Sequence, residues 1–453
     1  MSRTPAVPPS RGTHVTLIAW ALSLLLGVSP SSASAQDPEV AGLDKARRQV
    51  VVEEIAEVLI EQHVFPDIGK ACADHIRSRL AAGEYDEITD PGRLARVLTA
   101  DLNSVERDAH LRVELGPPDP YQEREDPASD EVRRRKYESF RRSNFGFRRI
   151  ELLDGITGYL DLRSFAPADV GGDVAVAAMT LLANSEAVII DLRNNRGGSG
   201  EMVQLIASYF FAEPKHLISI ETRGEDLVKQ SWTFAYVPGK RMPNTPLYIL
   251  TSGGTGSAAE EFAYDLKHHD RATIIGETTG GGGHTAYVAR IADTFNLVVP
   301  HGRPIHPVTG TDWDGIGVKP DIEVPAKEAL SRARLEALRA VQARGGDDGP
   351  TINFRWAQEV IEAELSPPEL SAAMLAEYAG RYGPLTVTVE DGVLYARMGP
   401  GSPRALRPVS QTRFLVEGLD DVRAEFVRDD NGEVVAVISE FEDGRSRRVE
   451  RAQ

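Results

Sequence analysis

The stretch LYILTSGGTGSAAEEF, residues 247–262, joins an apolar strand to a helix through a glycine-rich turn. Leu247–Thr251 has the composition of a buried strand, and the helix is expected to begin after Ser257. The glycines let a substrate carbonyl approach the main chain, and the N–H groups at the start of the helix could stabilise an oxyanion. Ser257 is therefore either a nucleophile or simply the N-cap of the helix, its hydroxyl accepting from the N–H of Glu260. The local sequence leaves both interpretations open.

Short apolar segments alternate with helical ones on both sides of this turn. The strand candidates are Thr157–Leu162, Ala187–Leu192, Leu247–Thr251, Ala272–Gly276 and Asn296–Val299, and the helical candidates are Val174–Asn184, Glu201–Phe211 and Ala258–His268. This alternation predicts an α/β domain with βαβ units over residues 151–326. A second glycine-rich turn, at residues 195–198, also follows a strand. Both turns are expected at the carboxyl ends of strands, where open α/β sheets bind their ligands.

The segments that flank the α/β domain have other patterns. Helical spacing predicts a bundle at residues 44–115, with Asp90-Pro91 starting its third helix and Cys72 buried. Residues 116–150 are a polar linker and a basic run typical of a solvated helix face, and residues 327–365 are a helical linker. Residues 366–453 predict a small antiparallel barrel or sandwich, with strand candidates Leu385–Val389, Val393–Ala396, Phe414–Val416, Ala424–Val427 and Val434–Ile438.

The first residues have the pattern of an export signal. Arg3 and Arg11 precede the apolar run Val15–Val28, which is shorter than the roughly 20 residues that span a bilayer. Ala33-Ser34-Ala35 then forms a small-residue cleavage site. Residues 1–35 are therefore predicted to be a cleaved signal peptide, and the mature chain to be periplasmic or extracellular without a stable membrane anchor.

Composition narrows the function classes. The 453 residues carry 51 Lys and Arg against 68 Asp and Glu, a formal net charge of −17, which argues against nucleic acid as a partner. One cysteine excludes a disulfide framework and a cysteine-rich metal site. His268-His269, His301 and His306 lack the spacing of a metal motif, and the glycine turns lack the signatures of nucleotide loops. The sequence predicts no metal and no organic cofactor.

Four motifs occur in order along the chain: DLRNNRGG at 191–198, TSGGTGSAAE at 251–260, GETTG at 276–280 and GIGVKPDI at 315–322. Together they resemble the core of the tail-specific, or C-terminal processing, serine peptidases. The segment RDAHLRV at 107–113 resembles the branch that contains interphotoreceptor retinoid-binding protein and tricorn protease. More weakly, YAGRYG at 378–383 resembles the lipocalin-like domain appended to some bacterial hydrolases. The resemblance implies a crotonase-like α/β core.

The family resemblance implies acyl transfer with Ser257 as the nucleophile. The implied oxyanion donors are the backbone amides of Gly197 or Gly198 and of Ala258. In many members a lysine at a fixed spacing after the serine is the general base, but that position is Gly282 here. A Ser-Lys dyad is therefore excluded, and another group must deprotonate the serine.

Two histidines are candidates for this base. His110 stands where the tricorn-like branch places its histidine, and His284 closes the glycine run in which the lysine is missing. A histidine can accept the serine proton and return it to the leaving amine. The orienting acid is expected to be Asp314, where the branch normally has a glutamate, with Asp108 as the alternative. Glu260 is expected to be mainly structural.

These observations predict a secreted or periplasmic serine endopeptidase that cuts exposed or unfolded polypeptide. The segment between His110 and Gly155 is too short for the substrate-binding PDZ domain that family members often carry. The alternatives are a module that binds apolar ligands on the same fold and a hydrolase of non-peptide esters or amides. An intact set of Ser257, His110 and Asp314 favours the enzyme, because a carrier would not need it.

Overall fold

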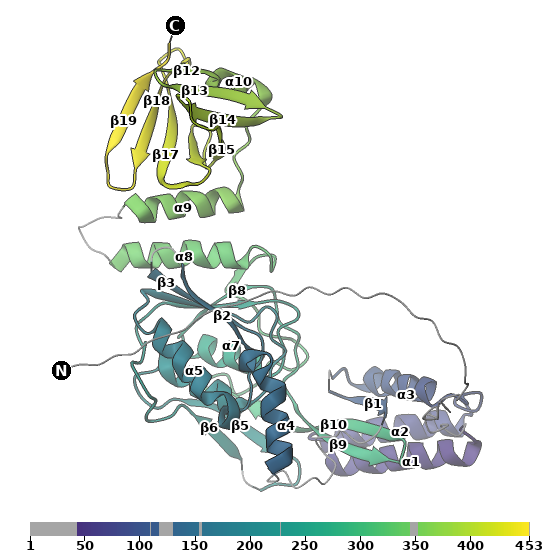
Figure 1. The fold of residues 1–453 in the computed structure, drawn as a ribbon. Coiled ribbons are helices and arrows are strands. Elements are labelled where there is room, and N and C mark those ends of the chain that lie inside the picture. Colours follow the sequence, from purple (N-terminus) through teal and green to yellow (C-terminus); the bar gives the residue numbers. More distant parts are fainter. Residues whose placement is uncertain are drawn as a thin grey trace, which may run out of the picture. The chain divides into compact units, whose positions relative to one another are not determined.

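The computed structural model describes residues 43–108, 110–116, 130–153, 156–226, 228–344 and 352–452 (Figure 1). The predicted signal peptide lies outside the described residues, as do most of the polar linker and residues 345–350. Within the described ranges, no helix has both the length and the apolar character needed to cross a bilayer.

The N-terminal part is a three-helix bundle with one strand: α1 (Lys45–Gln62), α2 (Pro66–Ala81), α3 (Pro91–Val105) and β1 (Arg112–Leu115). The carboxylate of Asp90 accepts the N–H of Arg93 at 2.7 Å at the start of α3, which confirms the predicted cap. Cys72 is fully buried, as predicted, and burial raises the pKa of its thiol to about 11.

The bundle is anchored to a long hairpin of the α/β region. The hairpin consists of β9 (Thr285–Ile291) and β10 (Phe295–Ile305), and its Leu297 belongs to the same apolar cluster as Leu59 and Leu98 of the helices. Strand β1 extends this sheet, pairing antiparallel with β10 so that Arg112 lies opposite Val298. The short segment before β1, which carries Asp108 and His110, is thereby fixed against the hairpin.

The central sheet has the strand order β11-β8-β7-β4-β3-β2. Its strands are β2 (Phe147–Leu153), β3 (Thr157–Leu162), β4 (Ala187–Asp191), β7 (Leu247–Thr251), β8 (Thr273–Gly276) and β11 (Ile322–Glu323), all parallel except β2. The helices are α5 (Ala168–Leu182), α6 (Gly200–Ala207) with the 3-10 turn η3 (Ser208–Phe210), and α7 (Ala258–His268). The predicted α/β core is confirmed; the strand limits of this sheet agree within a residue, whereas α5 begins at Ala168, well before the predicted Val174.

Alternate side chains of the sheet enter two different cores. Val188 and Ile190 of β4 pack in the cluster formed with α5, α6 and α7. Ala187 and Ile189 face the other way, against α8 (Ala329–Arg344). The two-residue period of a strand produces this division, and burial on both faces explains why these strands are continuous apolar runs.

A second sheet was missed by the sequence pattern, except for part of β10. It has the order β1-β10-β5-β6, with β9 also paired to β10, and contains β5 (His216–Thr222) and β6 (Lys229–Trp232). Most residues of β6 and β9 are exposed or only half-buried. Apolar periodicity is weak in such strands, so the sequence carried little signal for them.

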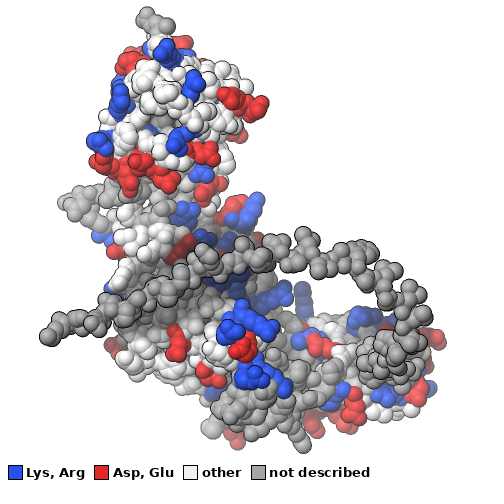
Figure 2. All heavy atoms as spheres, viewed as in Figure 1, with Lys and Arg blue, Asp and Glu red and all other residues white. Residues whose placement is uncertain are grey.

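The basic run forms α4 (Asp130–Arg141), followed by the 3-10 turn η1 (Asn144–Gly146). Arg141 on this helix is exposed and pairs with Glu138 at 3.0 Å, as expected of a solvated helix face. Acidic and basic side chains are interspersed on the face of the molecule drawn in Figure 2.

The C-terminal part begins with α9 (Ile352–Leu365) and α10 (Ala372–Tyr378). Eight antiparallel strands follow and pair in sequence order: β12 (Gly380–Tyr382), β13 (Leu385–Glu390), β14 (Val393–Met398), β15 (Arg404–Pro408), β16 (Arg413–Val416), β17 (Leu419–Arg428), β18 (Val434–Phe441) and β19 (Ser446–Glu450). A bridge between Tyr382 and Arg451 and a hydrogen bond from Ala452 N–H to the Arg381 carbonyl oxygen at 2.7 Å join the first strand to the last. The small antiparallel domain is thus a near-closed barrel, and its short strands β12, β15 and β19 were not predicted.

Candidate active site

Ser257 stands at the turn between β7 and α7, and its residue is exposed. Its backbone has φ +53° and ψ −127°, a conformation that side-chain-bearing residues rarely adopt. Ser257 and Glu260 form a capping box, in which the Glu260 carboxylate accepts the N–H of Ser257 at 2.8 Å. Ser257 is thus the N-cap residue of α7, but the N–H of Glu260 donates to its carbonyl oxygen at 2.7 Å, and a place at the N-cap does not exclude a role as nucleophile.

Glu260 is completely buried and connects the Ser257 turn to the glycine run at residues 280–283. One carboxylate oxygen accepts the Thr279 hydroxyl at 2.5 Å and the Gly281 N–H at 2.6 Å. The other oxygen accepts from Ser257 and, at 2.9 Å, from Gly282 N–H. Burial raises the pKa of Glu260, while these hydrogen bonds act in the opposite direction. These four bonds give Glu260 the structural role that the sequence suggested.

The glycine turn after β4 lies directly against the Ser257 turn. A Cβ at Gly197 would lie 2.7 Å from the Cβ of Ser257 and 2.9 Å from the backbone nitrogen of Ala258, so this position tolerates only glycine. The N–H of Gly197 donates to Oδ1 of Asn195 at 2.8 Å and is engaged. The N–H groups of Gly198 and Ala258, in contrast, donate to no acceptor among the described residues. These two amides are the candidates for an oxyanion hole.

His110 approaches the same place from the bundle side. A Cβ at Gly282 would lie 3.3 Å from Cε1 and 3.7 Å from Nε2 of His110. The imidazole therefore occupies the space that a side chain at position 282 would enter. The His110 side chain keeps 23% of its surface exposed, so a substrate can reach it.

Asp108 holds the His110 main chain but not yet its ring. Oδ1 of Asp108 accepts the N–H of His110 at 2.6 Å, whereas Nδ1 of His110 lies 3.7 Å from the same oxygen and is buried without a hydrogen bond. No hydrogen bond joins Ser257 Oγ to either His110 or His284 in the described part of the chain. Among the described residues, therefore, no hydrogen bond yet links the Ser257 hydroxyl to a histidine that could accept its proton.

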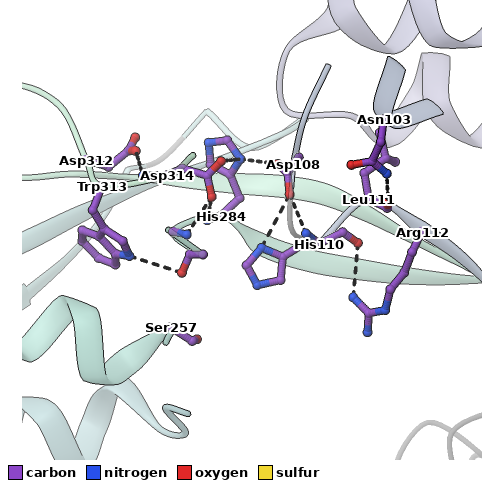
Figure 3. A network of polar contacts seen from close by, with 12 residues as sticks. Asn103, Asp108, His110, Leu111, Arg112, Ser257, His284, Asp312, Trp313 and Asp314 are labelled. Carbon is purple, nitrogen blue, oxygen red and sulfur yellow. Dashed lines mark hydrogen bonds and ion pairs between the residues drawn. The ribbon is translucent and has the colours of Figure 1, made fainter. Parts of the chain in front are cut away.

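His284 also contacts Asp108, and Figure 3 draws it above His110, which lies between it and the level of Ser257. Nδ1 of His284 is 2.6 Å from Oδ2 of Asp108 and 3.3 Å from Oδ2 of Asp314. Asp314 also accepts the N–H groups of Gly283 at 2.7 Å and His284 at 3.2 Å. The structure therefore brings Asp108, His110, His284 and Asp314 into one network, with Asp108 at its centre.

The electrostatics of this network define an ion pair. Burial opposes ionisation of Asp108, but hydrogen bonds from His110 and His284 outweigh burial and lower its pKa. Burial also opposes the cation of His284, yet the Asp108 hydrogen bond and the Asp314 charge raise its pKa. Burial and the neighbouring Asp108 carboxylate raise the pKa of Asp314. Asp108 is thus favoured as the anion and His284 as the cation.

Asp108, His284 and Asp314 also form the one described group of three side chains with metal-ligand geometry, their ligand atoms lying within 4.8 Å of one another. The 2.6 Å separation of His284 Nδ1 from Asp108 is that of a charge-assisted hydrogen bond, which requires a proton between the two atoms. A metal ion would have to displace that proton, because a ligating histidine nitrogen is unprotonated. The donor set therefore fits an ion pair better than a metal centre.

Several contributors to the site were not predicted from sequence. Asn195 holds Gly197, and the indole N–H of Trp313 donates to the carbonyl oxygen of Gly282 at 3.2 Å. The ring of Phe65 packs edge-on against His284, with ring centroids 5.6 Å apart. Phe65 precedes α2 in the bundle and is far from His284 in sequence, so no local pattern could reveal this contact.

Two family models match this chain. The model described as peptidase family S41 matches residues 156–324, and the model described as the N-terminal domain of peptidase S41 in eukaryotic IRBP matches residues 37–141. These ranges contain the Ser257 turn and the His110 segment, respectively.

Curated relatives match part of this chain. The carboxyl-terminal-processing peptidase 2, chloroplastic, of Arabidopsis thaliana is 32% identical over 173 residues, 37% of this chain and 32% of the relative. The carboxyl-terminal-processing protease of Synechocystis is 29% identical over 195 residues, 42% of this chain and 43% of the relative. The matches thus span less than half the length of these two relatives.

A solved structure of a putative peptidase from Parabacteroides merdae aligns with a TM-score of 0.47 and 18% identity, covering 68% of this chain and 99% of that one. Together the two family models match residues 37–141 and 156–324, which is more than half of this chain. The chain therefore belongs to peptidase family S41, with an N-terminal domain of the kind found in eukaryotic IRBP.

Proposed function

We propose that this chain is a serine endopeptidase that hydrolyses exposed or unfolded polypeptide through an acyl-enzyme on Ser257. The observation that carries the proposal is the setting of Ser257: an exposed hydroxyl in a constrained turn at a helix N-terminus, next to the uncommitted N–H groups of Gly198 and Ala258. Membership of family S41 supports the same chemistry. The signal-like pattern of residues 1–35 supports action in the periplasm or outside the cell.

His110 is the proposed general base. In the first step its Nε2 accepts the proton of Ser257 Oγ as this oxygen bonds to the carbonyl carbon, and the oxyanion is held by the amides of Gly198 and Ala258. His110 then gives the proton to the leaving amine as the C–N bond breaks. In the second step a water molecule gives a proton to His110 and attacks the acyl carbon. The ester bond to Ser257 then breaks, His110 returns the proton to Ser257 Oγ, and the new carboxyl end is released.

His284 is unsuited to this role. It is buried, its Nδ1 is committed to Asp108, and its raised pKa favours the protonated form, which cannot accept the serine proton. His110 contacts the Gly282 surface beside Glu260, whose carboxylate holds Ser257. We therefore assign the base to His110 and leave His284 a supporting function.

Asp108 is the proposed orienter of His110. Its Oδ1 lies 3.7 Å from Nδ1 of His110, so a movement of about 1 Å would complete a hydrogen bond of ordinary length. Asp314, the expected orienter, instead contacts His284 and two backbone amides. The proposed relay is therefore Ser257, His110 and Asp108. His284 pairs with Asp108, and Asp314 in turn contacts His284.

The proposal is tested by incubating the wild-type chain and Ser257→Ala with an unfolded protein and following new N-termini by mass spectrometry. We expect cleavage by the wild type and a loss of roughly 10³-fold or more in the variant, because the nucleophile is removed. Ser252→Ala, in the same glycine-rich turn, is the matched control. Equal rates for wild type and Ser257→Ala, or cleavage of small esters but of no polypeptide, would contradict a peptidase.

A further inference from the structure

The barrel formed by β12–β19 is filled at one end and hollow at the other. The filled end is plugged by α10, whose Tyr378 is completely buried and donates its hydroxyl to the Gln411 carbonyl oxygen at 2.8 Å. Tyr378 stacks on Phe426 with ring centroids 4.5 Å apart, and Phe414 and Tyr382 pack around them. The aromatic rings occupy this half of the interior and close it.

The other half of the barrel encloses a cavity of about 520 Å³. Its floor includes Phe426, and its walls include the small side chains of Ala396 and Ala424 together with Leu406 and Val437. The small residues leave the space that aromatic rings fill at the plugged end. Volumes of roughly 300–1,000 Å³ are typical of pockets for small-molecule ligands, and eight-stranded barrels can hold one such ligand.

The cavity reaches the surface at the end of the barrel opposite α10. Met398 and Leu419 line it and are 54% and 37% exposed, which gives the opening an apolar rim. Water gains few hydrogen bonds in an apolar space, so occupation by an apolar molecule is favoured.

The charged groups that line the cavity are exposed, and the hydroxyl-bearing Ser402 and Ser439 line it as well. The charged groups are Arg404 and Asp421. One guanidinium nitrogen of Arg404 donates to the Glu417 carbonyl oxygen at 2.9 Å. One positive and one negative side chain at the same opening do not select a ligand by net charge. They favour a polar end that is uncharged and exchanges hydrogen bonds with either group.

We propose that this cavity is a binding site for a small uncharged amphiphile, its apolar body inside the barrel and its polar end at Arg404 and Asp421. The site is separate from the Ser257 region and goes beyond the proposed peptidase activity. Binding there does not require a functioning nucleophile.

The experiment is a fluorescence titration of the full chain with N-phenyl-1-naphthylamine, an uncharged apolar probe, with 1-dodecanol as the competitor. We expect saturable binding of one probe per chain, displaced by the alcohol. Ala424→Phe, which fills the cavity beside its floor, should weaken binding at least about tenfold. Thr388→Phe is the matched control, because Thr388 is exposed on β13 next to inward-facing Val387, and it should bind as the wild type does.

Thermal unfolding establishes that each variant is folded, and Ala396→Leu replaces Ala424→Phe if the latter is not. Ser257→Ala should bind the probe with unchanged affinity, so failure of the peptidase proposal leaves this one standing. The absence of saturable binding, or equal binding by the wild type and a folded cavity-filling variant, would overturn the proposal.

Discussion

The Ser257 turn and the His110 segment differ in how completely they are fixed. Ser257 is held through Glu260, a buried carboxylate that accepts four hydrogen bonds, and Gly197 packs closely against it. His110 is fixed at its main chain, but its Nδ1 is buried without a partner and lies 3.7 Å from Asp108. The proposed nucleophile and oxyanion amides are therefore in place before substrate binds, whereas the proposed base needs a small movement that substrate binding can supply.

The largest effect is expected at His110, whose ring Nδ1 lacks a hydrogen-bond partner among the described residues. His110→Ala should lower the rate of polypeptide cleavage by roughly 10²- to 10⁴-fold, the usual contribution of a general base, without unfolding the chain. Initial rates of cleavage and circular dichroism measure the two quantities. His75→Ala, on α2, is the control. If His110→Ala cleaves at the wild-type rate, His110 is not the general base, and the comparison with Ser257 fails.

Gly197→Ala tests whether the Ser257 turn must keep its observed position. The added Cβ would lie 2.7 Å from the Cβ of Ser257 and 2.9 Å from the nitrogen of Ala258, so either the turn or the oxyanion site must shift. The expected loss of kcat is roughly 10²- to 10³-fold, comparable to the loss of an oxyanion donor. Gly253→Ala serves as the control, because a Cβ there meets no atom within 4 Å. Full activity in Gly197→Ala would show that catalysis does not depend on the close packing of Gly197 against the Ser257 turn.

The two carboxylates of the network should contribute unequally. Asp108→Asn should lower kcat by roughly 10²-fold, since it leaves His110 without an anionic partner. Asp314→Asn should have a smaller effect, because Asp314 contacts His284 and backbone amides. Steady-state kinetics of the two matched variants decide the order. A greater loss in Asp314→Asn would restore Asp314 as the orienter of His110.

The smallest effect concerns His284 and is seen in stability against pH. The pKa of His284 is raised in the folded state, so its contribution is fully present below the unfolded pKa of about 6.5 and is lost as pH rises through the folded pKa. In wild type, the free energy of unfolding should therefore fall as pH increases above about 6.5. Urea titrations of His284→Gln should show a shallower fall, with some activity retained. An identical pH dependence in both proteins would refute the ion pair.

The sequence predicted what local patterns control. The limits of β3, β7 and α7 agree with the predicted segments, because buried strands and a capped helix have clear signals in neighbouring residues. The placement of Ser257 between strand and helix depends on the same local signals. The resemblance to a family then supplied His110, which no pattern in the sequence connects to Ser257.

The sequence could not show the arrangement behind His110. Asp108, His284 and Asp314 come from three distant segments, and the pairing of β1 with β10, the glycine run before β9 and the loop after β10 bring them together. The engagement of Gly197 by Asn195, which leaves Gly198 and Ala258 as the candidate amides, is equally a matter of backbone geometry. Strands such as β9 and β19 are largely exposed and lack the apolar alternation that would have revealed them.

The central claim is that Ser257 is a nucleophile activated by His110. Its most direct test is the rate at which a fluorophosphonate labels Ser257, followed by mass spectrometry of the intact chain and its peptides. We expect labelling at Ser257 in the wild type, slower but measurable labelling in His284→Gln, and almost none in His110→Ala. Labelling of His110→Ala at the wild-type rate, or a label that persists in Ser257→Ala, would contradict the claim.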